Sequence, residues 1–352
     1  MNISIISFTK QGCTLSQNLS KQLPEHEIHL YTKCQKAGKE QRIPFVEESI
    51  SQWACRQMEE KNALLFIGAC GIAVRAIAPH ITHKLHDSPV LVTDEYGTYV
   101  IPLLSGHIGG ANSLACAIAE NIGAVPVITT ATDLHHVFAA DIFAQKNNLF
   151  IENPQGIVTV SSKILSGEPI TLSVESGHLS HKSHPPAQVK IAEYPPQRTV
   201  DILVSSGEED WDASLRLKPR PYTIGIGCRK GKDAKTIEAF IRQSLNEAGL
   251  STEQVNALAT ITLKSKEQGL IAWSRKQRIP YITYTPEELE EITEAVHGSE
   301  FVKKITGVDN VCERAALKAA GPGGELVYEK HAKDGMTIAV AKGSWSVIFY
   351  ET

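Results

Sequence analysis

The sequence predicts an α/β protein, with two three-layer α/β/α domains joined by a less regular central subdomain. Two stretches support this class, because short β-like runs alternate with helical patterns over residues 1–134 and again over residues 221–352. Residues 135–220 instead hold β-like runs of uneven spacing and the Pro-, His- and Ser-rich segment SGHLSHKSHPPAQ. We therefore place an N-terminal domain at 1–134, a central subdomain and linker at 135–220, and a C-terminal domain at 221–352.

The N-terminal domain opens with the strand pattern MNISIISF, the loop and helix TKQGCTLSQNLSKQL, the strand EIHLYT and the amphipathic helix EESISQWACRQMEEK. ALLFIGA then predicts a buried strand, followed by the helix GIAVRAIAPH. PVLVTDE and TYVIPLL predict two strands that meet at a turn around Gly97. The helix ANSLACAIAENIG, closed by Gly123, and the strand VPVITTA complete a largely parallel sheet.

The central stretch contains the helix-like pattern VFAADIFAQKNN and the β-like runs GIVTVSSKIL, AQVKIAEY and TVDILVSS. After Pro219 and Pro221, the strand YTIGIG leads to the long helix AKTIEAFIRQSLNEAG, which Asp233 is placed to cap. ALATITL, EQGLIAWSRKQ, PYITYT and PEELEEITEAV continue the alternation of strand and helix. A helix near CERAALKAAG and the strands ELVYEK, TIAVAK and SVIFYE complete the predicted C-terminal domain.

The overall composition narrows the class of protein. A hydrophobic content of 42%, a charged content of 21% and a formal net charge of -4 are typical of soluble globular proteins, and they give no general attraction to nucleic acid or anionic membranes. The start MNISIISFTK does not read as a signal peptide, and the apolar run ALLFIGACGIAV is too short to span a bilayer. The seven cysteines are scattered and never form a C-x-x-C pair. We therefore expect a cytoplasmic protein without disulfides.

Two histidine-rich stretches, PHITHKLH and GHLSHKSH, raise the question of a metal site. On a helix, histidines at i and i+3 share a face, but the one at i+6 points elsewhere. No cysteine or acid nearby completes a set of ligands. Polar loops explain both stretches better, and we expect no metal bound by the protein itself.

The segment LLSGHIGGANSLA, residues 103–115, joins an apolar strand to a helix and contains one histidine, His107. Glycines at such a junction let the backbone approach a ligand, and the N–H groups of the helix's first turn attract anions. The spacing matches neither a dinucleotide or phosphate loop nor a G-x-S-x-G nucleophile elbow. A tight turn with a surface histidine and an anion-binding catalytic loop fit equally well. The candidate ligand-binding residues here are Ser105, Gly106, Gly109, Gly110 and Asn112, and Ser105 or Asn112 is placed to cap the helix.

Three other segments place polar residues or glycines where strands end. GACGIAVRAIAP offers Gly68, Gly71 and Arg75, whose guanidinium can bind a carboxylate, although a solvated helix residue is the more common role. DEY supplies Asp94 and Glu95 beside a turn. ITTATD ends a strand with the polar set Thr129, Thr130, Thr132 and Asp133. Capping or a polar wall explains the last two segments better than a catalytic role does.

GIGCRKGK is the equivalent loop of the C-terminal domain. Its backbone N–H groups and its cations, which include Lys232, would bind an anionic group well. A cysteine beside cations acquires a lowered pKa, although a lone cysteine is more often inert. The candidate residues here are Gly225, Gly227, Cys228, Arg229 and Lys230.

Together these segments resemble a known family. GIAVRAIAP, DEYGTYVIPLLSGHIGGAN and VPVITTATD resemble the N-terminal domain of the cobalt-precorrin-5A hydrolases of the anaerobic cobalamin pathway. IGIGCRKGK, ATITLKS, Glu267, Gly269 and TIAVAKG resemble the C-terminal domain of the same family. The resemblance is close over about residues 64–133 and good over 222–343, whereas the central stretch matches only in place and length.

The resemblance implies a hydrolase that opens the δ-lactone between the ring A acetate and C-20 of cobalt-precorrin-5A. Fragmentation then expels C-20 with its methyl group as acetaldehyde and leaves cobalt-precorrin-5B. The cobalt arrives with the substrate, so no separate cofactor is implied. The implied partner is this cobalt-corrinoid small molecule, and transient contacts with neighbouring pathway enzymes and a homodimer are further expectations.

Within that reading, His107 is the expected general base for the water that attacks the lactone. The N–H groups of Gly109 and Gly110 are expected to stabilise the oxyanion, and Asp94 or Glu95 to orient His107 or to move a proton. Arg75 and the cations of GIGCRKGK are expected to meet the substrate carboxylates, with the macrocycle between the two α/β domains. The alternative from another class is a non-catalytic carrier of a corrinoid intermediate.

Overall fold

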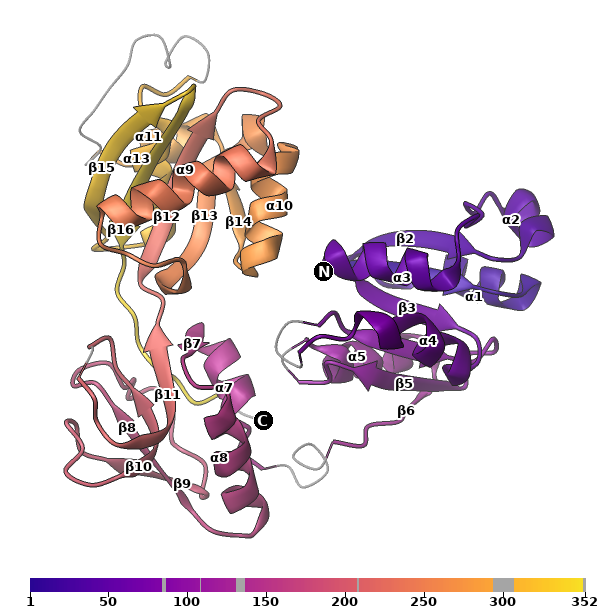
Figure 1. Ribbon diagram of the computed structural model, residues 1–352, viewed down its shortest axis with the longest axis horizontal. Helices are drawn as coiled ribbons and strands as arrows, with labels where there is room; N and C mark the ends of the chain where they lie inside the picture. The colour runs from indigo at the N-terminus through magenta and orange to yellow at the C-terminus, as the bar shows by residue number, and fades with distance from the viewer. Residues whose placement is uncertain (84–86, 108, 131–136, 208, 294–306, 351–352) are drawn as a thin grey trace. The chain divides into compact units, whose positions relative to one another are not determined.

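Figure 1 shows the computed structural model of the chain, which describes residues 1–352 except 84–86, 108, 131–136, 208, 294–306 and 351–352. The chain divides into two compact units, Met1–Val137 and Phe138–Thr352. Its described strands form three sheets, one in the first unit and two in the second. The predicted α/β class is confirmed, because the N-terminal sheet and the C-terminal sheet each have helices packed against both faces.

The first unit contains a six-stranded sheet in the order β2-β1-β3-β4-β5-β6. Its strands are β1 (Asn2–Ser7), β2 (Glu27–Thr32), β3 (Ala63–Ile67), β4 (Val90–Thr93), β5 (Tyr99–Leu104) and β6 (Val125–Pro126). Its helices are α1 (Lys10–Gln22), α2 (Gln35–Gln41), α3 (Ile50–Glu59), α4 (Cys70–Ile77) and α5 (Ala111–Ile122). Leu65 of β3 packs with α1 and α5, whereas its neighbours Leu64 and Phe66 pack with α3 and α4. A strand buried on both faces explains the uninterrupted apolar run ALLFI.

One strand of this sheet runs against the others beside it. β1, β2, β3 and β4 are parallel, but β5 is antiparallel to β4, with Val90 opposite Leu104 and Thr93 opposite Val100. The short edge strand β6 is parallel to β5. The segments that follow β5 and β6 therefore lie at the edge of the sheet opposite the carboxyl ends of β1, β3 and β4.

The central part of the second unit is more regular than predicted, since it has a sheet of its own in the order β7-β11-β10-β8-β9. The strands are β7 (Leu149–Ile151), β8 (Ile170–Val174), β9 (Val189–Ala192), β10 (Val200–Val204) and β11 (Ala213–Pro219), with helices α7 (Ala140–Lys146) and α8 (Gln155–Leu165). The prediction of a strand at GIVTVSSKIL is wrong, because these residues form most of α8. Ile157, Val160 and Ile164 are its buried positions, and their spacing is that of a helix face.

The C-terminal part of this unit is a second three-layer domain. Its sheet has the order β14-β13-β12-β16-β15, with β12, β13 and β14 parallel and β15 and β16 antiparallel. Helices α9 and α10 pack on one face and α11 and α13 on the other (Figure 1). The elements are β12 (Tyr222–Cys228), α9 (Ala234–Glu247), β13 (Val255–Ile261), α10 (Gln268–Gln277), β14 (Tyr281–Tyr284), α11 (Pro286–Glu290), α13 (Val311–Ala320), β15 (Glu325–Lys333) and β16 (Met336–Lys342).

The segment after β16 does not form the predicted third closing strand of this domain. Val347 instead pairs with Leu179 as an isolated bridge, and Phe349 packs against Phe138 and Phe143 of the central subdomain. Asn147 holds the same segment, donating to the Ile348 carbonyl at 3.0 Å and accepting from the Ile348 N–H at 2.7 Å. The apolar pattern of SVIFYE therefore fills the core of a subdomain that is distant in sequence.

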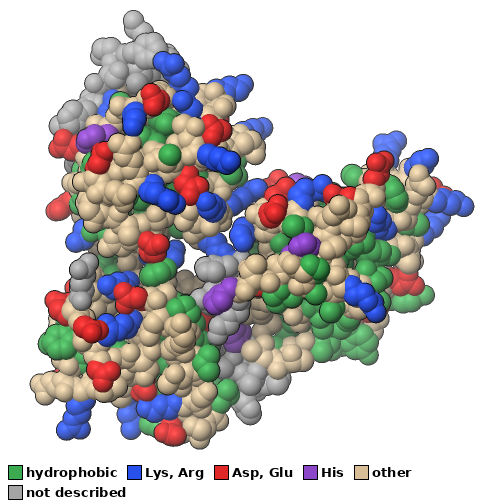
Figure 2. All heavy atoms as spheres, in the orientation of Figure 1, with side chains coloured by type: hydrophobic (Ala, Val, Ile, Leu, Met, Phe, Trp, Pro, Cys, Tyr) green, Lys and Arg blue, Asp and Glu red, His purple; other side chains and the backbone are tan. Residues whose placement is uncertain are grey.

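Surface properties agree with the composition. Figure 2 shows Lys and Arg side chains interspersed with Asp and Glu over the face in view. None of the helices that the structure describes is long and apolar enough to cross a membrane. All seven cysteines are free.

Replacing Phe349 with alanine tests the role of this last segment. We expect F349A to lose about 3–5 kcal/mol of the unfolding free energy of the central subdomain, because it leaves a cavity beside Phe138 and Phe143. Tyr350 is the matched control, since it is 48% exposed and Y350A removes a ring of similar size. Urea unfolding followed by circular dichroism measures both, and equal losses in the two variants would contradict the assignment.

Candidate functional site

The loop between β5 and α5 is held by its own backbone. Ser105 has a left-handed conformation with φ 56°, and its hydroxyl donates to the Asp87 carbonyl at 2.9 Å. A methyl group added at Gly109 would lie 2.4 Å from Cβ of Ser105, so only glycine fits this close turn. Gly110, with φ 83°, is the N-cap residue of α5.

The first N–H groups of α5 already have acceptors. The Gly110 N–H donates to the His107 carbonyl at 2.8 Å, and the N–H groups of Ala111 and Asn112 donate to the carbonyls of Ser105 and Gly106 at 3.1 and 3.0 Å. The expected anion site at this helix end is thus filled by loop carbonyls. Gly110 is not free to stabilise an oxyanion in this arrangement, which leaves Gly109 as the candidate donor.

The capping prediction for this helix is wrong, because α5 has no side-chain cap. Ser105 bonds to Asp87 instead, and the Asn112 amide donates to the Thr130 hydroxyl at 3.0 Å. The structure therefore brings Asn112 and Thr130 together, and Asn112 lies beside Gly106 of the loop that contains His107. Thr129 is exposed beside Thr130. The predicted residues Thr132 and Asp133 lie outside the described residues.

Asp94 and Glu95 do not lie near His107 within this unit, and their predicted role in orienting it needs correction. They follow β4, whereas His107 follows the antiparallel β5, so roughly 16 Å of strand separates the two ends. The sequence does carry a signal for this reversal, because two strands joined by a short turn around Gly97 run antiparallel, but the predicted role of the two carboxylates did not take it into account. The Glu95 carboxylate instead accepts from the Thr9 hydroxyl at 2.6 Å.

The Asp94 carboxylate holds the turn between β4 and β5. It accepts from the N–H groups of Tyr96, Thr98 and Tyr99 at 2.9, 2.9 and 3.0 Å, and from the Thr98 hydroxyl at 3.2 Å. Partial burial raises the pKa of Asp94, but the hydrogen bonds from Tyr99, Tyr96 and Thr98 lower it by more, so the net pKa is below its ordinary value. Asp94 is a turn-stabilising residue rather than a proton carrier.

Gly68, Gly71 and Arg75 lie at the same edge as Asp94. The Gly68 N–H donates to the Thr93 carbonyl at 2.8 Å. The exposed Arg75 guanidinium donates to the Gly71 carbonyl of its own helix at 3.1 Å. These contacts favour the interpretation of Arg75 as a solvated helix residue over a role in binding a carboxylate.

Replacing Asp94 with asparagine tests its structural role. Because the folded carboxyl has a lowered pKa, its stabilising effect is present above the ordinary pKa near 3.8 and is lost as the pH falls toward the folded value. We expect D94N to unfold about 1–2 kcal/mol more easily at neutral pH and to lose part of the acid dependence of stability. Urea unfolding between neutral and acid pH measures this. E95Q is the control, and an effect of E95Q equal to that of D94N would refute the role.

In the C-terminal domain, the predicted Gly225 and Gly227 lie inside β12 rather than in the loop. A methyl group added at Gly225 would lie 1.8 Å from the Cys312 carbonyl oxygen and 2.6 Å from the Ala316 nitrogen. Gly225 therefore allows α13 to pack closely on β12, and its predicted contact with substrate is corrected to a packing role.

The loop after β12 is tied to a buried carboxylate. Glu267 is 9% exposed, and it accepts from the Gly231 N–H at 2.6 Å and from Lys264 Nζ at 3.4 Å. The predicted cap by Asp233 is confirmed, because its carboxylate accepts from the Thr236 N–H at 2.9 Å. These contacts fix the chain on both sides of Lys232.

A cavity of about 430 Å³ lies where β12 and β13 end. This is the edge of a parallel sheet where α/β proteins bind ligands. Of the predicted residues, Gly227, Cys228 and Arg229 line it, whereas Lys230 does not. Three further cations that line it, Lys264, Lys330 and Lys333, were not predicted from the sequence. Together with Arg229 they make four cations, and Asp334 is the acid among the lining residues.

The two thiols in this cavity are not activated. Burial raises the pKa of Cys228, and Glu267 adds to that effect, so that together they outweigh Lys264 and Lys232. The expected lowering of the Cys228 pKa is therefore wrong, because desolvation outweighs the neighbouring cations. Burial likewise raises the pKa of Cys312 to about 11. Both thiols are protonated at neutral pH and form part of the apolar wall.

A sequence signal exists for the missed lysines that lie near the Asp334–Gly335 pair, Lys330 and Lys333. Asp334 and Gly335 have φ values of 50° and 74°, as expected for the two central residues of a tight hairpin turn between β15 and β16. A DG pair between two β-like runs predicts that turn, and Lys333 precedes it directly. The signal does not reveal where the hairpin lies in the sheet.

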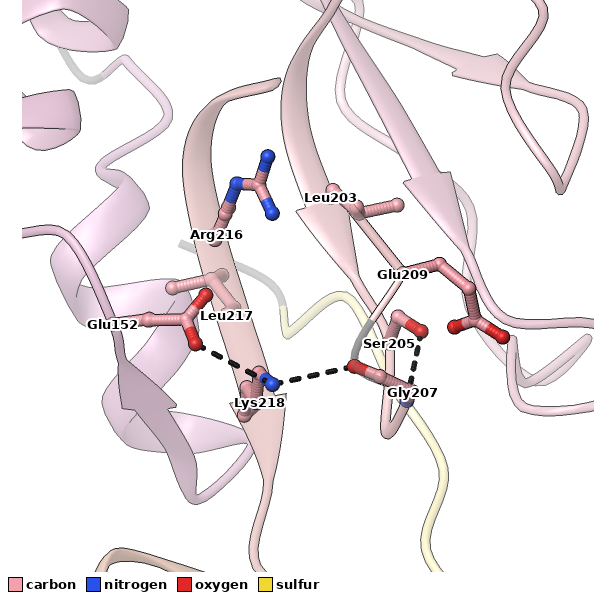
Figure 3. Close-up of a pocket in the computed structure, with 8 residues that line it drawn as sticks. All are labelled: Glu152, Leu203, Ser205, Gly207, Glu209, Arg216, Leu217 and Lys218. Atoms are coloured by element: carbon pink, nitrogen blue, oxygen red, sulfur yellow. Dashed lines mark hydrogen bonds and ion pairs between the residues drawn. The ribbon is translucent and has the colours of Figure 1, made fainter. Parts of the chain in front are cut away.

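The central subdomain has a second, smaller pocket of about 270 Å³. Figure 3 shows Lys218 between Glu152 and the Gly207 carbonyl, at 3.3 and 3.2 Å. Arg216 is paired with Asp210. The cations of this pocket are thus neutralised by nearby acids, which makes it a weaker anion site than the C-terminal cavity.

Replacing Gly225 with alanine tests the close packing of α13 on β12. We expect G225A to lose about 3 kcal/mol or more of unfolding free energy, since the added methyl group meets backbone atoms that cannot move independently. G227A is the control on the same strand, because its methyl group would meet the rotatable Thr337 hydroxyl at 2.7 Å. Chemical denaturation compares them, and a mild effect of G225A would show that α13 is not held at this distance.

Comparison with known proteins agrees with the resemblance seen in the motifs. Three family models match consecutive parts of the chain: "Cobalamin synthesis G N-terminal" over residues 52–133, "Cobalamin biosynthesis central region" over 138–221 and "Cobalamin synthesis G C-terminus" over 222–341. A solved cobalamin biosynthesis protein G homolog from Sulfolobus solfataricus is 23% identical, with a TM-score of 0.42 over 97% of each chain.

Two relatives extend over nearly the whole chain. A cobalt-precorrin-5A hydrolase from Priestia megaterium is 32% identical, covering 96% of this chain and 94% of the relative. A cobalt-precorrin-5A hydrolase from Salmonella typhimurium is 33% identical, covering 96% of this chain and 97% of the relative. The chain belongs to the cobalt-precorrin-5A hydrolase family.

Proposed function

We propose that the protein opens the ring A acetate δ-lactone of cobalt-precorrin-5A and releases C-20 as acetaldehyde, giving cobalt-precorrin-5B in cobalamin biosynthesis. The observation that carries this proposal is the match along 96% of the chain to hydrolases that are named for this substrate. The cationic cavity of the C-terminal domain supports it, because the substrate carries many carboxylates around a flat macrocycle.

The reaction has two steps that balance without an oxidant or reductant. Water attacks the lactone carbonyl, the acyl C–O bond breaks, and the products are a ring A carboxylate and a hydroxyl on C-20. Loss of the hydroxyl proton then forms the C=O of acetaldehyde while the bond from C-20 to the macrocycle breaks. The electron pair of that bond stays on the macrocycle, which takes up a proton.

We assign the base for the first step to His107. Its imidazole lies in the loop that the close turn at Gly109 fixes, and a neutral imidazole accepts a proton at neutral pH. The amide of Asn112 and the hydroxyl of Thr130, joined by a hydrogen bond, are the polar groups beside this loop. The Gly109 N–H is the assigned oxyanion donor.

We also propose that the reaction needs no separate cofactor and takes place in the cytoplasm. The cobalt is part of the substrate, and the residues assigned above act without a further cofactor. We place the protein in the cytoplasm, which its seven free cysteines support, because thiols stay reduced there.

Replacing His107 with alanine tests the assigned base. We expect H107A to release acetaldehyde from cobalt-precorrin-5A at least about 100-fold more slowly than the wild type, with unchanged substrate affinity. A positioned base contributes rate factors of this size. H29A is the control, because His29 is a partly exposed histidine of the same unit on β2. An aldehyde-trapping assay at multiple turnovers measures the rate. A wild-type rate in H107A would refute the assignment, and stoichiometric binding without aldehyde by the wild type would indicate a carrier.

A further inference from the structure

We propose that the cavity of the C-terminal domain binds the carboxylate-bearing edge of a cobalt corrinoid, with Lys330 and Lys333 of the β15–β16 hairpin as its main carboxylate contacts. This inference rests on the proposed function, because that function supplies the chemical class of the ligand. Beyond the reaction itself, we thereby assign the recognition of the ligand's carboxylates to the β15–β16 hairpin.

Cations outnumber acids among the residues that line the cavity. Arg229, Lys264, Lys330 and Lys333 line the cavity, and Asp334 is the acid among the lining residues, although the whole chain has a net charge of -4. Lys264 is paired with the buried Glu267 carboxylate at 3.4 Å, so the imbalance concerns the other three cations. Among the described residues, the Arg229 guanidinium has no hydrogen-bond or ion-pair partner. A cluster of like charges around one cavity is unfavourable unless an anionic ligand offsets it.

The cavity also has an apolar wall. Ile261, Val311 and Met336 line the cavity and are buried. The protonated thiols of Cys228 and Cys312 belong to the same wall. Apolar walls with a few charged groups at the rim suit a flat macrocycle with acetate and propionate side chains, and they do not suit a small inorganic anion.

The β15–β16 hairpin is held in place by contacts within the domain, without any ligand. The ladder between β15 and β16 is irregular between Tyr328 and His331, and the Lys330 N–H donates to the buried Glu313 carboxylate at 2.8 Å. Lys333 Nζ donates to Gln243 Oε1 at 2.8 Å. The Asp334–Gly335 turn brings the backbone back beside β12, where the Arg229 N–H donates to the Gly335 carbonyl at 3.0 Å. Such preorganisation lowers the ordering cost of binding.

The test uses the full-length protein and a stable probe, cobyrinic acid, which is a cobalt corrinoid with free peripheral carboxylates. Its fully methylated ester keeps the macrocycle and removes the charges. Titration calorimetry compares the wild type with the double variant K330Q/K333Q. We expect the double variant to bind cobyrinic acid at least about 10-fold more weakly, and the wild type to discriminate against the ester.

The control variant is R242Q/K276Q, which removes the same charge from the same domain. Arg242 of α9 and Lys276 of α10 both pair with Glu238 of α9, and neither residue lines the cavity. Unchanged affinity in K330Q/K333Q, equal loss in R242Q/K276Q, or equal binding of acid and ester would each overturn the inference. Circular dichroism checks that the variants fold.

Acetaldehyde release by the wild type separates this inference from the proposed function. If the wild type turns over cobalt-precorrin-5A and the lysine variants bind cobyrinic acid normally, the reaction stands and the inference fails. If the wild type releases no aldehyde but binds cobyrinic acid through Lys330 and Lys333, the hydrolase assignment fails and the site stands.

Discussion

The close approach of α13 to β12 at Gly225 is the contact on which the cavity of the C-terminal domain depends. Because Gly225 has no side chain, the carbonyl of Cys312 lies against the strand, and the start of α13 reaches the end of the sheet. Val311 and Cys312 then form part of the cavity wall. The next residue, Glu313, is fully buried and holds the Lys330 N–H and the Asn310 amide, which attaches the β15–β16 hairpin to the same helix. One helix, held close to the strand at Gly225, thus supplies both a wall of the cavity and the attachment of the hairpin.

In the first unit, the reversed direction of β5 has a comparable effect. The antiparallel pairing of β4 with β5 moves the loop of His107 to the edge of the sheet opposite Asp94, Glu95 and Arg75. The carboxylates that the sequence offered as partners of the histidine serve the β4–β5 turn and Thr9 instead. The role proposed for His107 therefore involves no relay through a carboxylate from that turn.

Much of this fold could be predicted from sequence, because buried strands and amphipathic helices leave strong local patterns. The errors arise where distant parts of the chain decide the structure. Val347 and Phe349 have a strand-like pattern but complete a core distant in sequence, and α8 is rich in β-branched residues yet buries a helical face. Of the cavity residues, Cys228 and Arg229 could be predicted because they follow a strand directly. Lys330 and Lys333 could not, because only the pairing of β16 with β12 brings them there.

The central claim is that the C-terminal cavity recognises the corrinoid through its hairpin. Hydrogen exchange of the full-length protein, with and without cobyrinic acid, tests it most directly. The account predicts slower exchange on binding in the loop 228–232, in residues 261–264 and in the hairpin 328–337, because these backbone segments surround the cavity. Unchanged exchange in all three segments, together with protection confined to other parts of the chain, would contradict it.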